Sequence, residues 1–401
     1  MKDAYIIDYI RTPIGSFGGT LAPVRTDDLA VIVLKELLKR NPHVDFTQVG
    51  DVILGCANQA GEDNRNVARM ASLMAGLPIN VPGETVNRLC ASGLSATVAA
   101  ARAIMVGDAE LAISGGVENM TRGPWIMSKT STPYGRDAQL FDSSFGWRFV
   151  NPKMKEQFGV DAMGETAENL VDRDKVSRED QDKFSFNSQR KAKAAQERGR
   201  FAKEIVAVEI PGKKGEVKIF DKDEFMKPDT TVEGLGKLKP SFRKEGTVTA
   251  GNAAGLNDGA AALLLASSDA VKKYNLKPLA KIVSSGAFGV EPRIMGIGPV
   301  EAANIALKRA GLTWKDIDII ELNEAFAAQA LAVIRSWGLK DDDERINPNG
   351  GAIALGHPLG MSGARILGSA ALELHEKNKR YALVTMCIGV GQGYAVIIEK
   401  A

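Results

Sequence analysis

A cysteine between an extended segment and a helix is the first feature of this chain that points to chemistry. The stretch ETVN (84–87) has extended character, and the Ala-rich run 94–105 predicts a helix that ends at Gly107. Cys90 therefore lies at a helix N-terminus, where free N–H groups and the helix dipole favour a thiolate. This position predicts a lowered thiol pKa and a nucleophile, although a buried, inert cysteine fits the same stretch.

Three stretches of the C-terminal part carry the other reactive side chains. They are ELNEAF (321–326), GGAIALGHPLG (350–360) with His357, and CIGVGQG (387–393), which begins with Cys387. Each follows a predicted strand or precedes a predicted helix, where α/β folds place their ligands. A thiolate, an imidazole that accepts its proton and a second thiol for acid/base work would together suit nucleophilic catalysis.

Metal and nucleotide chemistry fit the spacing poorly. Zinc ligands usually come in closely spaced pairs, whereas Cys90, His357 and Cys387 are isolated, so no metal site is predicted. The chain has no GxxxxGK[ST] and no GxGxxG after an early strand, so no phosphate-binding fingerprint is present. His43 and His375 have polar neighbours and are predicted at the surface, and Cys56 in the core.

Composition sets the class of protein. The chain has 401 residues, 44% hydrophobic and 25% charged, which predicts a soluble globular protein of two or three domains. A net charge of +2 with interspersed signs gives no reason to expect nucleic acid as a partner. Three cysteines indicate a reducing compartment, and no apolar run approaches the roughly 18 residues of a membrane span. A cytoplasmic protein without membrane contact is expected.

Strands and helices alternate in the first 120 residues. Strands are predicted at 5–9, 51–55 and 110–114, the last followed by a Gly115-Gly116 turn, with helices at 27–39 and 66–75. This alternation predicts a layered α/β fold.

The last 130 residues repeat this pattern. Ser92-Gly93 corresponds to Ser362-Gly363 at an offset of 270, and DVI at 51–53 corresponds to DII at 318–320. The pairing predicts two pseudo-symmetric βα halves whose helix N-termini, at 90–93 and 360–363, lie near a common axis.

The composition of the chain changes between residues 121 and 249. Aromatic residues gather with Pro, Ser and Gly, and a charged helix is predicted from 177 to 198, opened by a capping box. The region is predicted to be an insertion, and its aromatic cluster is either a local core or a lid over substrate. The aromatic residues concerned are Trp125, Tyr134, Phe141, Phe145, Trp147 and Phe149.

Taken together, the motifs resemble the thiolases over essentially the whole chain. The matching stretches are NRLCASG (87–93), GTVTAGN (246–252), NEAF (323–326), GHP (356–358) and CIGVG (387–391). Three further stretches are similar to the 3-oxoadipyl-CoA thiolase branch: NQAGEDNRN (58–66), GWRFVNP (146–152) and GIGPV (296–300).

The resemblance implies a thiolase fold with a layered α/β/α/β/α core and three parts. These are an N-terminal half (1–120 and 250–271), an inserted loop domain for CoA and substrate (121–249), and a C-terminal half (272–401). It also implies a homodimer or homotetramer, coenzyme A as substrate and no prosthetic group.

The resemblance further implies catalytic roles. Cys90 attacks a 3-oxoacyl-CoA, His357 accepts its proton, and Cys387 protonates the departing carbanion. His357 with a water held by Asn323 binds the thioester oxygen, and the N–H groups of Cys90 and Gly389 bind the acyl oxyanion. Asn323 by itself would fit a helix cap equally well.

CoA-binding residues follow from the same resemblance, with two departures. Ala254 stands where the family usually has Ser, and Lys227 where some members have Arg, so a point charge replaces a planar fork. Met163 and Phe326 match apolar walls of the pantetheine tunnel, with ordinary core as the alternative, and Ala325 belongs to the same set.

Alternatives remain for the activity and its substrate. A general 3-ketoacyl-CoA or acetoacetyl-CoA thiolase, a decarboxylating condensing enzyme of the same fold and a non-catalytic CoA-binding scaffold are the competing interpretations. If the substrate ends in a carboxylate, Arg65 and Arg148 of the branch motifs are the candidate cations, unless they form surface ion pairs.

Overall fold

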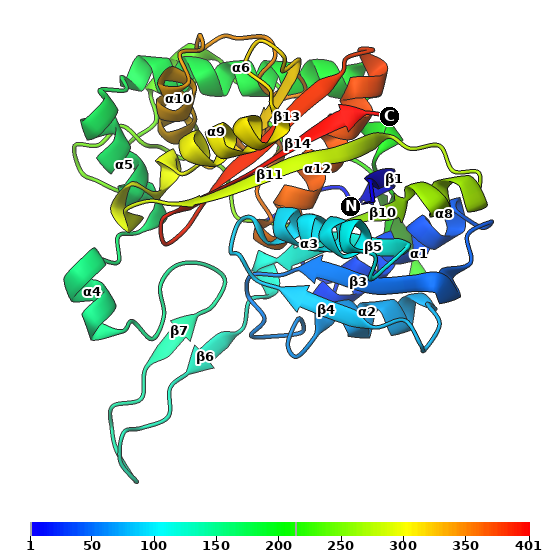
Figure 1. Ribbon diagram of the computed structural model, residues 1–401. Helices are drawn as coiled ribbons and strands as arrows, with labels where there is room; N and C mark the ends of the chain where they lie inside the picture. Colours follow the sequence, from blue (N-terminus) through cyan, green and yellow to red (C-terminus); the bar gives the residue numbers. More distant parts are fainter. Residues whose placement is uncertain (1, 213–214) are drawn as a thin grey trace.

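The computed structural model describes residues 2–212 and 215–401 and is built on one large sheet (Figure 1). The predicted insertion therefore has two residues, 213–214, outside the described part, and Met1 is outside it as well. The sheet has the order β12–β13–β14–β11–β1–β10–β5–β3–β4, with β2 (Gly15–Ser16) added on β10. In that order its strands are Ile319–Leu322, Tyr381–Ile388, Gln392–Lys400, Ala280–Gly289, Ala4–Arg11, Asn257–Ser267, Leu111–Asn119, Val49–Gly55 and Gly83–Val86.

The sheet consists of two halves that meet at a narrow seam. Strands β1 and β11 pair through only two residue pairs, Tyr5 with Lys281 and Ile6 with Ala280. On either side of this seam the strands pair over much longer registers, such as nine pairs between β10 and β5. The predicted duplication is thus visible as two sheet halves that share an edge.

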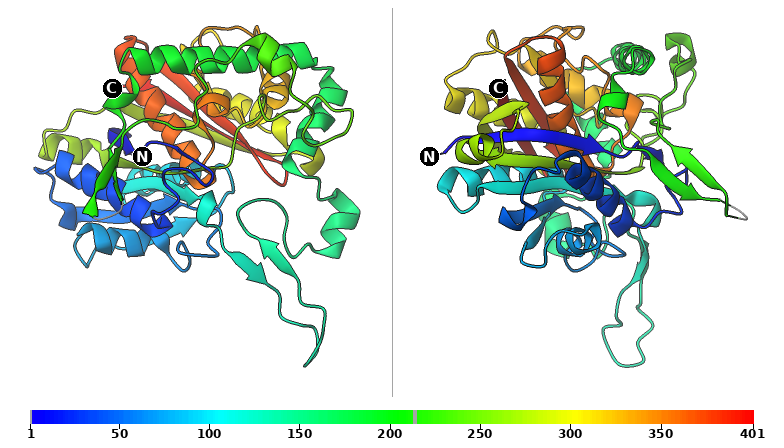
Figure 2. Two further views of the ribbon diagram at one scale, coloured as in Figure 1. Left: turned by 180° about the vertical axis from the view of Figure 1, so that it is seen from behind. Right: turned by 90° about the vertical axis from the view of Figure 1, so that its right-hand side faces the viewer.

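Helices form three layers around these halves. Helices α1 (Thr26–Arg40) and α2 (Val67–Ala75) pack on the outside of the N-terminal half, and α9 (Pro299–Ala310) and α10 (Ala327–Ser336) outside the C-terminal half. Helices α3 (Ser92–Val106) and α12 (Leu359–Glu376) lie between the halves (Figure 2). This confirms the layered α/β fold.

The two central helices contact each other reciprocally. A Cβ on Gly93 would lie 2.9 Å from the backbone N of Ala364, and a Cβ on Gly363 would lie 2.4 Å from the backbone N of Leu94. Because Gly93 corresponds to Gly363 and Leu94 to Ala364 at the offset of 270, the contact maps onto itself. The predicted common axis therefore passes between these helix N-termini.

The predicted turn at Gly115-Gly116 was wrong. Strand β5 runs straight through both glycines to Asn119. Glycine is needed there for close packing, because a Cβ on Gly116 would lie 1.9 Å from the carbonyl oxygen of Gly360 at the start of α12. The glycine pair thus marks the contact of a strand with a helix backbone.

One apolar window also differs from the expectation. Leu89–Val106 has the length and composition of a membrane span, and 56% of it is buried. The window coincides with α3, which is sandwiched between the two sheet halves against α12. Its apolar character is that of a core helix.

The chain between β5 and β10 forms several helices and two hairpins. The elements are β6 (Trp125–Met127), β7 (Leu140–Asp142), α4 (Pro152–Phe158), α5 (Met163–Asp174), α6 (Arg178–Glu197), β8 (Val208–Pro211), β9 (Val217–Phe220) and α7 (Val232–Gly236). The short helices α8 (Ser268–Lys273) and α11 (Ala352–Leu355) lie outside this region. The predicted charged helix is α6, and Ser177 caps it by accepting from Asp180 N.

The aromatic cluster of this region is not a local core. Trp125 is 74% exposed and Tyr134 fully so, on the β6–β7 hairpin that projects from the body of the molecule (Figures 1 and 2). Phe141 and Phe149 do pack edge to face, with ring centroids 4.9 Å apart. The hairpin therefore presents apolar surface to its surroundings.

Candidate active site

A short, strained turn carries Cys90 between β4 and α3. Leu89, the preceding residue, has a left-handed φ of 47°, which is uncommon for a branched side chain. The side chain of Asn87 accepts from Leu89 N at 2.8 Å, and the Ser92 hydroxyl donates to the Leu89 carbonyl at 2.7 Å. The turn is thus fixed by hydrogen bonds on both sides. Cys90 lies between β4 and the N-terminus of α3, as the sequence predicted.

His357 is held in one tautomer. The Ser362 hydroxyl donates to the Pro358 carbonyl at 2.8 Å, so it accepts from His357 Nδ1–H at 2.7 Å. Nε2 is left unprotonated and faces the Asn323 amide nitrogen at 3.4 Å. Burial, helped by the charge of Arg365, lowers the pKa of His357 to about 3. The imidazole is therefore neutral near pH 7 and able to accept a proton at Nε2.

The predicted lowering of the Cys90 pKa was wrong. Burial raises the pKa of the Cys90 thiol to about 11, and the backbone N–H groups of Gly389 and Cys90 only partly oppose this shift. Loss of hydration outweighs the helix N-terminus, because the sulfur lies between the two halves of the molecule. The Cys90 thiol and the His357 imidazole are therefore both neutral at rest.

Cys387 and Gly389, at the end of β13, lie beside the Cys90 turn. Cys387 is 1% exposed, and burial raises the pKa of its thiol, with a further contribution from the nearby sulfur of Cys90. A Cβ on Gly389 would lie 3.3 Å from the Leu89 side chain. Val390 has a φ of 63°, so strained backbone flanks the site on this side too.

Asn323 is buried beside these groups and does not cap a helix. The N-cap of α10 is Phe326, so the helix-cap alternative was wrong. Asn323 Oδ1 is buried without a hydrogen-bond partner among residues 2–212 and 215–401, while Nδ2 faces His357. An unpartnered buried acceptor beside a base is suited to hold a water or a substrate group.

An apolar hollow lies beside α6 and α7 of the inserted region. Lys227 lines it, exposed, with its ammonium 5.9 Å from the centroid of the Phe225 ring. The other lining residues are Gln189, Asp229, Thr230, Thr231, Gly234, Leu235, Leu238, Ala250, Gly251 and Ile353.

Short contacts connect the hollow with the catalytic groups. Ala254 N donates to the Ala325 carbonyl at 3.0 Å, and the ring of Phe326 packs edge to face on Phe242 at 6.1 Å. Ala325 and Phe326 are buried in one apolar cluster with Cys387. Met163 lies partly buried against the same cluster, 3.6 Å from the position of a Cβ on Gly389. Of the five predicted CoA-binding residues, Lys227 lines the hollow, whereas Ala325, Phe326 and Met163 lie in or against the cluster of Cys387.

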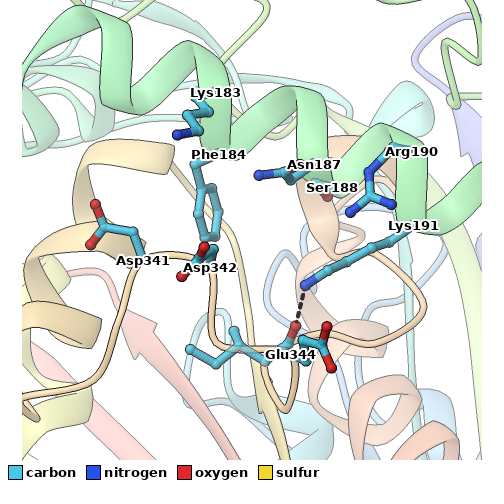
Figure 3. Close-up of a pocket in the computed structure, with 10 residues that line it drawn as sticks. Lys183, Phe184, Asn187, Ser188, Arg190, Lys191, Asp341, Asp342 and Glu344 are labelled. Carbon is cyan, nitrogen blue, oxygen red and sulfur yellow. Dashed lines mark hydrogen bonds between the residues drawn. The ribbon is translucent and has the colours of Figure 1, made fainter.

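A second hollow on another face of α6 holds charges of both signs (Figure 3). Its lining consists of Lys183, Phe184, Asn187, Ser188, Arg190, Lys191, Asp341, Asp342, Glu344 and Ile346. Lys191 reaches across it and donates to the Ile346 carbonyl at 2.7 Å. No cysteine or histidine lines this hollow, so it is separate from the residues predicted to be catalytic.

Glu118 is a supporting residue that the sequence analysis missed. It lies on β5, and its carboxylate accepts from the backbone N–H groups of Ala57, Asn58 and Gly360 at 2.8–3.0 Å. Burial raises its pKa to about 7 despite these bonds. Glu118 therefore joins the N-terminal half to the start of α12, beside His357; its signal was a lone acidic residue in an apolar strand.

Cys56, confirmed as a core residue, lies with Asp63 beside Glu118. Ligand-type atoms of the three residues lie within 4.8 Å of one another, a grouping that spacing did not predict. Asp63 already accepts from Gly61 N, and Cys56 Sγ lies 3.6 Å from Asp63. The three side chains act as partners of each other and of the surrounding backbone. His43 and His375 are exposed, as predicted.

Comparison with known families finds two family models, which match adjacent regions of the chain. The family models described as "Thiolase, N-terminal domain" and "Thiolase, C-terminal domain" match residues 4–269 and 276–400. A relative from Escherichia coli (strain K12), the "3-oxoadipyl-CoA/3-oxo-5,6-dehydrosuberyl-CoA thiolase", is 59% identical over 400 residues and covers 100% of both chains.

Two further proteins represent the wider group. An "Acetyl-CoA acetyltransferase" from Chromobacterium violaceum is 46% identical over 97% of each chain. The crystal structure of human mitochondrial 3-ketoacyl-CoA thiolase in complex with CoA superposes with a TM-score of 0.92 at 43% identity, covering 100% of this chain and 98% of that one. Similarity thus extends over the full length in both sequence and fold.

Proposed function

The chain belongs to the thiolase family, and from this premise we propose that it cleaves 3-oxoadipyl-CoA with coenzyme A. The products are acetyl-CoA and a shortened acyl-CoA, formed through an acyl-Cys90 intermediate. The observation that carries the substrate is the full-length similarity to a relative named for 3-oxoadipyl-CoA.

The first half-reaction uses the neutral thiol–imidazole pair. Cys90 Sγ attacks the 3-keto carbon while His357 Nε2 takes the thiol proton, since a raised thiol pKa disfavours a free thiolate at rest. The C2–C3 bond then breaks, and its electron pair passes to the enolate of acetyl-CoA. Cys387 gives its proton to C2, as its raised pKa suits an acid that remains protonated until the carbanion forms.

The second half-reaction returns every proton. Coenzyme A loses its thiol proton to the Cys387 thiolate and attacks the acyl carbon on Cys90. The shortened acyl-CoA leaves, and His357 gives its proton back to the Cys90 sulfur. Atoms and charges balance over the cycle, and the free enzyme is restored.

Negative oxygen atoms need fixed donors in both steps. The N–H groups of Cys90 and Gly389 stabilise negative charge at the Cys90 sulfur, so an acyl oxyanion on that sulfur would meet the same donors. Protonated His357 Nε2 and a water held by the free Oδ1 of Asn323 would bind the thioester oxygen. These assignments follow the family resemblance.

Coenzyme A would enter through the apolar hollow. Lys227 meets a phosphate at its mouth, and Met163, Ala325 and Phe326 line the pantetheine path. Ala254 lacks the hydroxyl of the usual Ser, so one hydrogen bond to pantetheine is absent. No prosthetic group takes part in the cycle, and the catalytic residues include no metal ligand set.

Assembly is the further part of the proposal. Strand β4 pairs on one side only within the described chain, and Trp125, Met127 and Leu140 of the projecting hairpin are 61–74% exposed. A free strand edge and an apolar hairpin suit a homodimer or homotetramer of a cytoplasmic protein. The proposed division is into halves 1–120 with 250–271 and 272–401, around the insertion 121–249. The end of one family region at 269 and the start of the next at 276 support the boundary between the halves.

A substrate panel tests the proposed activity. Thiolysis of acetoacetyl-CoA, followed at the enolate absorbance, distinguishes a thiolase from a decarboxylating condensing enzyme or a scaffold, which would give no cleavage. The kcat/KM values of 3-oxoadipyl-CoA and 3-oxohexanoyl-CoA then separate the charged from the neutral six-carbon chain. Equal values would contradict the oxoadipyl assignment and leave a general 3-ketoacyl-CoA thiolase.

A further inference from the structure

The carboxylate at the far end of the proposed acyl chain needs a cation in the pocket. An ionised carboxylate in an apolar tunnel would be strongly unfavourable without one. The structure separates the two arginines of the branch motifs. Arg65 is exposed and has a left-handed φ of 61°, whereas Arg148 is half-buried.

Arg148 lies in the covering loop (143–149) and has no ionic partner. Its Nη1 donates to the Ser143 carbonyl at 3.4 Å, and no carboxylate of residues 2–212 or 215–401 lies within 4.0 Å of its guanidinium. Arg122, also partly buried, is by contrast paired with Glu62. A guanidinium has five N–H donors in a planar fork, so Arg148 retains the capacity to bind a carboxylate.

One end of the covering loop is joined to the turn of the nucleophile. The Ser143 carbonyl that Arg148 contacts also accepts from Asn58 Nδ2 at 3.0 Å. The neighbouring Ala57 carbonyl accepts from Asn87 Nδ2 at 3.0 Å, three residues before Cys90. The anchor of Arg148 is therefore linked through two hydrogen bonds to the turn that positions the reacting sulfur.

The other end of the covering loop is joined to the segment before α5. Trp147 Nε1 donates to the Asp161 carbonyl at 3.3 Å, two residues before Met163. The Met163 sulfur lies 3.6 Å from the position of a Cβ on Gly389, which itself lies beside the Cys90 turn. The loop is thus tied at Ser143 to the turn of Cys90 and at Trp147 to the segment before Met163, and Arg148 directly follows the second of these contacts.

We infer that Arg148, and not Arg65, binds the terminal carboxylate of the acyl chain. The inference rests on the proposed function, since only a dicarboxylic acyl group supplies that anion. The contact is bidentate in the geometry that a guanidinium favours with a carboxylate. It discriminates chains of equal length by the charge at their far end.

The test compares matched arginine variants on two substrates of equal length. For wild type, Arg148→Met and Arg65→Met, the ratio of kcat/KM for 3-oxoadipyl-CoA to that for 3-oxohexanoyl-CoA is measured. Loss of one charge-assisted contact should lower the ratio roughly ten- to a hundredfold in Arg148→Met. Arg65→Met should keep the wild-type ratio. If Arg148→Met does not fold by thermal melting, Arg148→Gln takes its place and should also lower the ratio.

The outcomes separate the two claims. A wild-type preference that survives in the Arg148 variants, or that disappears only in Arg65→Met, overturns the arginine assignment and leaves the proposed substrate standing. A wild-type ratio near one overturns the proposed substrate, and the subsite with it.

Discussion

A serine lies at the equivalent position in the first turn of α3 and of α12, but the two serines have different roles. In the N-terminal copy the Ser92 hydroxyl donates to the Leu89 carbonyl and closes the turn before Cys90. In the C-terminal copy Ser362 accepts from the ring of His357 and fixes its tautomer. One copy thus uses the serine to shape the backbone of the nucleophile, and the other uses it to orient the base.

This difference separates the positions that the duplicated fold provides from the chemistry that the side chains provide. The reciprocal contacts of Gly93 and Gly363 bring the two helix starts together whatever side chains precede them. The reactive groups differ because one copy has a cysteine before its helix and the other a histidine. Shared packing therefore sets position, and the residues that differ set the chemistry.

Removing the nucleophile should have the largest effect. Cys90→Ala should form no acyl-enzyme and lower kcat for thiolysis by at least about a thousandfold, since His357 and Cys387 cannot replace the attacking sulfur. Mass spectrometry of protein incubated with acetoacetyl-CoA checks for the acyl adduct. An adduct on the variant at wild-type yield would refute Cys90 as nucleophile.

The two serines should respond differently to the same change. Ser362→Ala removes the acceptor for His357 Nδ1–H, so kcat/KM should fall about ten- to a hundredfold, a part of what a general base contributes. Ser92→Ala should mainly lower the free energy of unfolding, by about 1 kcal/mol for the lost hydrogen bonds. Kinetics and urea denaturation of both variants give the comparison. A larger kinetic loss in Ser92→Ala would contradict the division of roles.

Alkylation against pH measures the resting state of Cys90. With a pKa of about 11, its thiolate fraction should rise about tenfold per pH unit between pH 7 and 9, and the iodoacetamide rate with it. Cys56, fully buried with a raised pKa, should react more slowly throughout. The Cys90→Ala protein serves as the blank. A rate that is flat above pH 7 would indicate a thiolate–imidazolium pair.

Alanine at the crossing of the central helices should have the smallest effect on the kinetics, because it changes stability. Gly93→Ala and Gly363→Ala each force a Cβ against backbone at 2.4–2.6 Å, which should lower the free energy of unfolding by about 1–3 kcal/mol. Gly236→Ala is the matched control, because its Cβ would meet nothing within 4 Å. Loss at only one of the two helix glycines would break the symmetry of the contact.

The sequence predicted those features that repeat or alternate along the chain. The offset of 270 was enough to predict the common axis. The capping box predicted the start of α6, and the Ala-rich run predicted the start of α3, each within a residue or two. Chemical residue types on glycine-rich stretches predicted which side chains meet. These signals are local in sequence, or are repeated in it.

The predictions that were wrong, and the residue that was missed, depend on contacts between distant segments. The Gly115-Gly116 turn was wrong because the start of α12, about 245 residues later, packs on that strand. The prediction for the Cys90 pKa was wrong because folding buries the sulfur beside the backbone of Gly389, about 300 residues later. Glu118 was missed because its N–H partners come from two distant segments, the loop after β3 and the first turn of α12. Neither spacing nor propensity reports such contacts.

Separating the half-reactions in Cys387→Ala tests the account most directly. Acyl transfer is followed by exchange of labelled coenzyme A into acetyl-CoA, and carbanion chemistry by exchange of the acetyl-CoA methyl protons with deuterium. Cys90 and His357 remain in this variant, and the coenzyme A thiol, unlike C2 of acetyl-CoA, can also exchange its proton with water. The account therefore predicts that coenzyme A exchange persists at a reduced rate, while deuterium exchange and carbon–carbon cleavage are lost. If all three persist at wild-type rates in Cys387→Ala, Cys387 is not the acid and base, and the proposed division between the two sulfurs is contradicted.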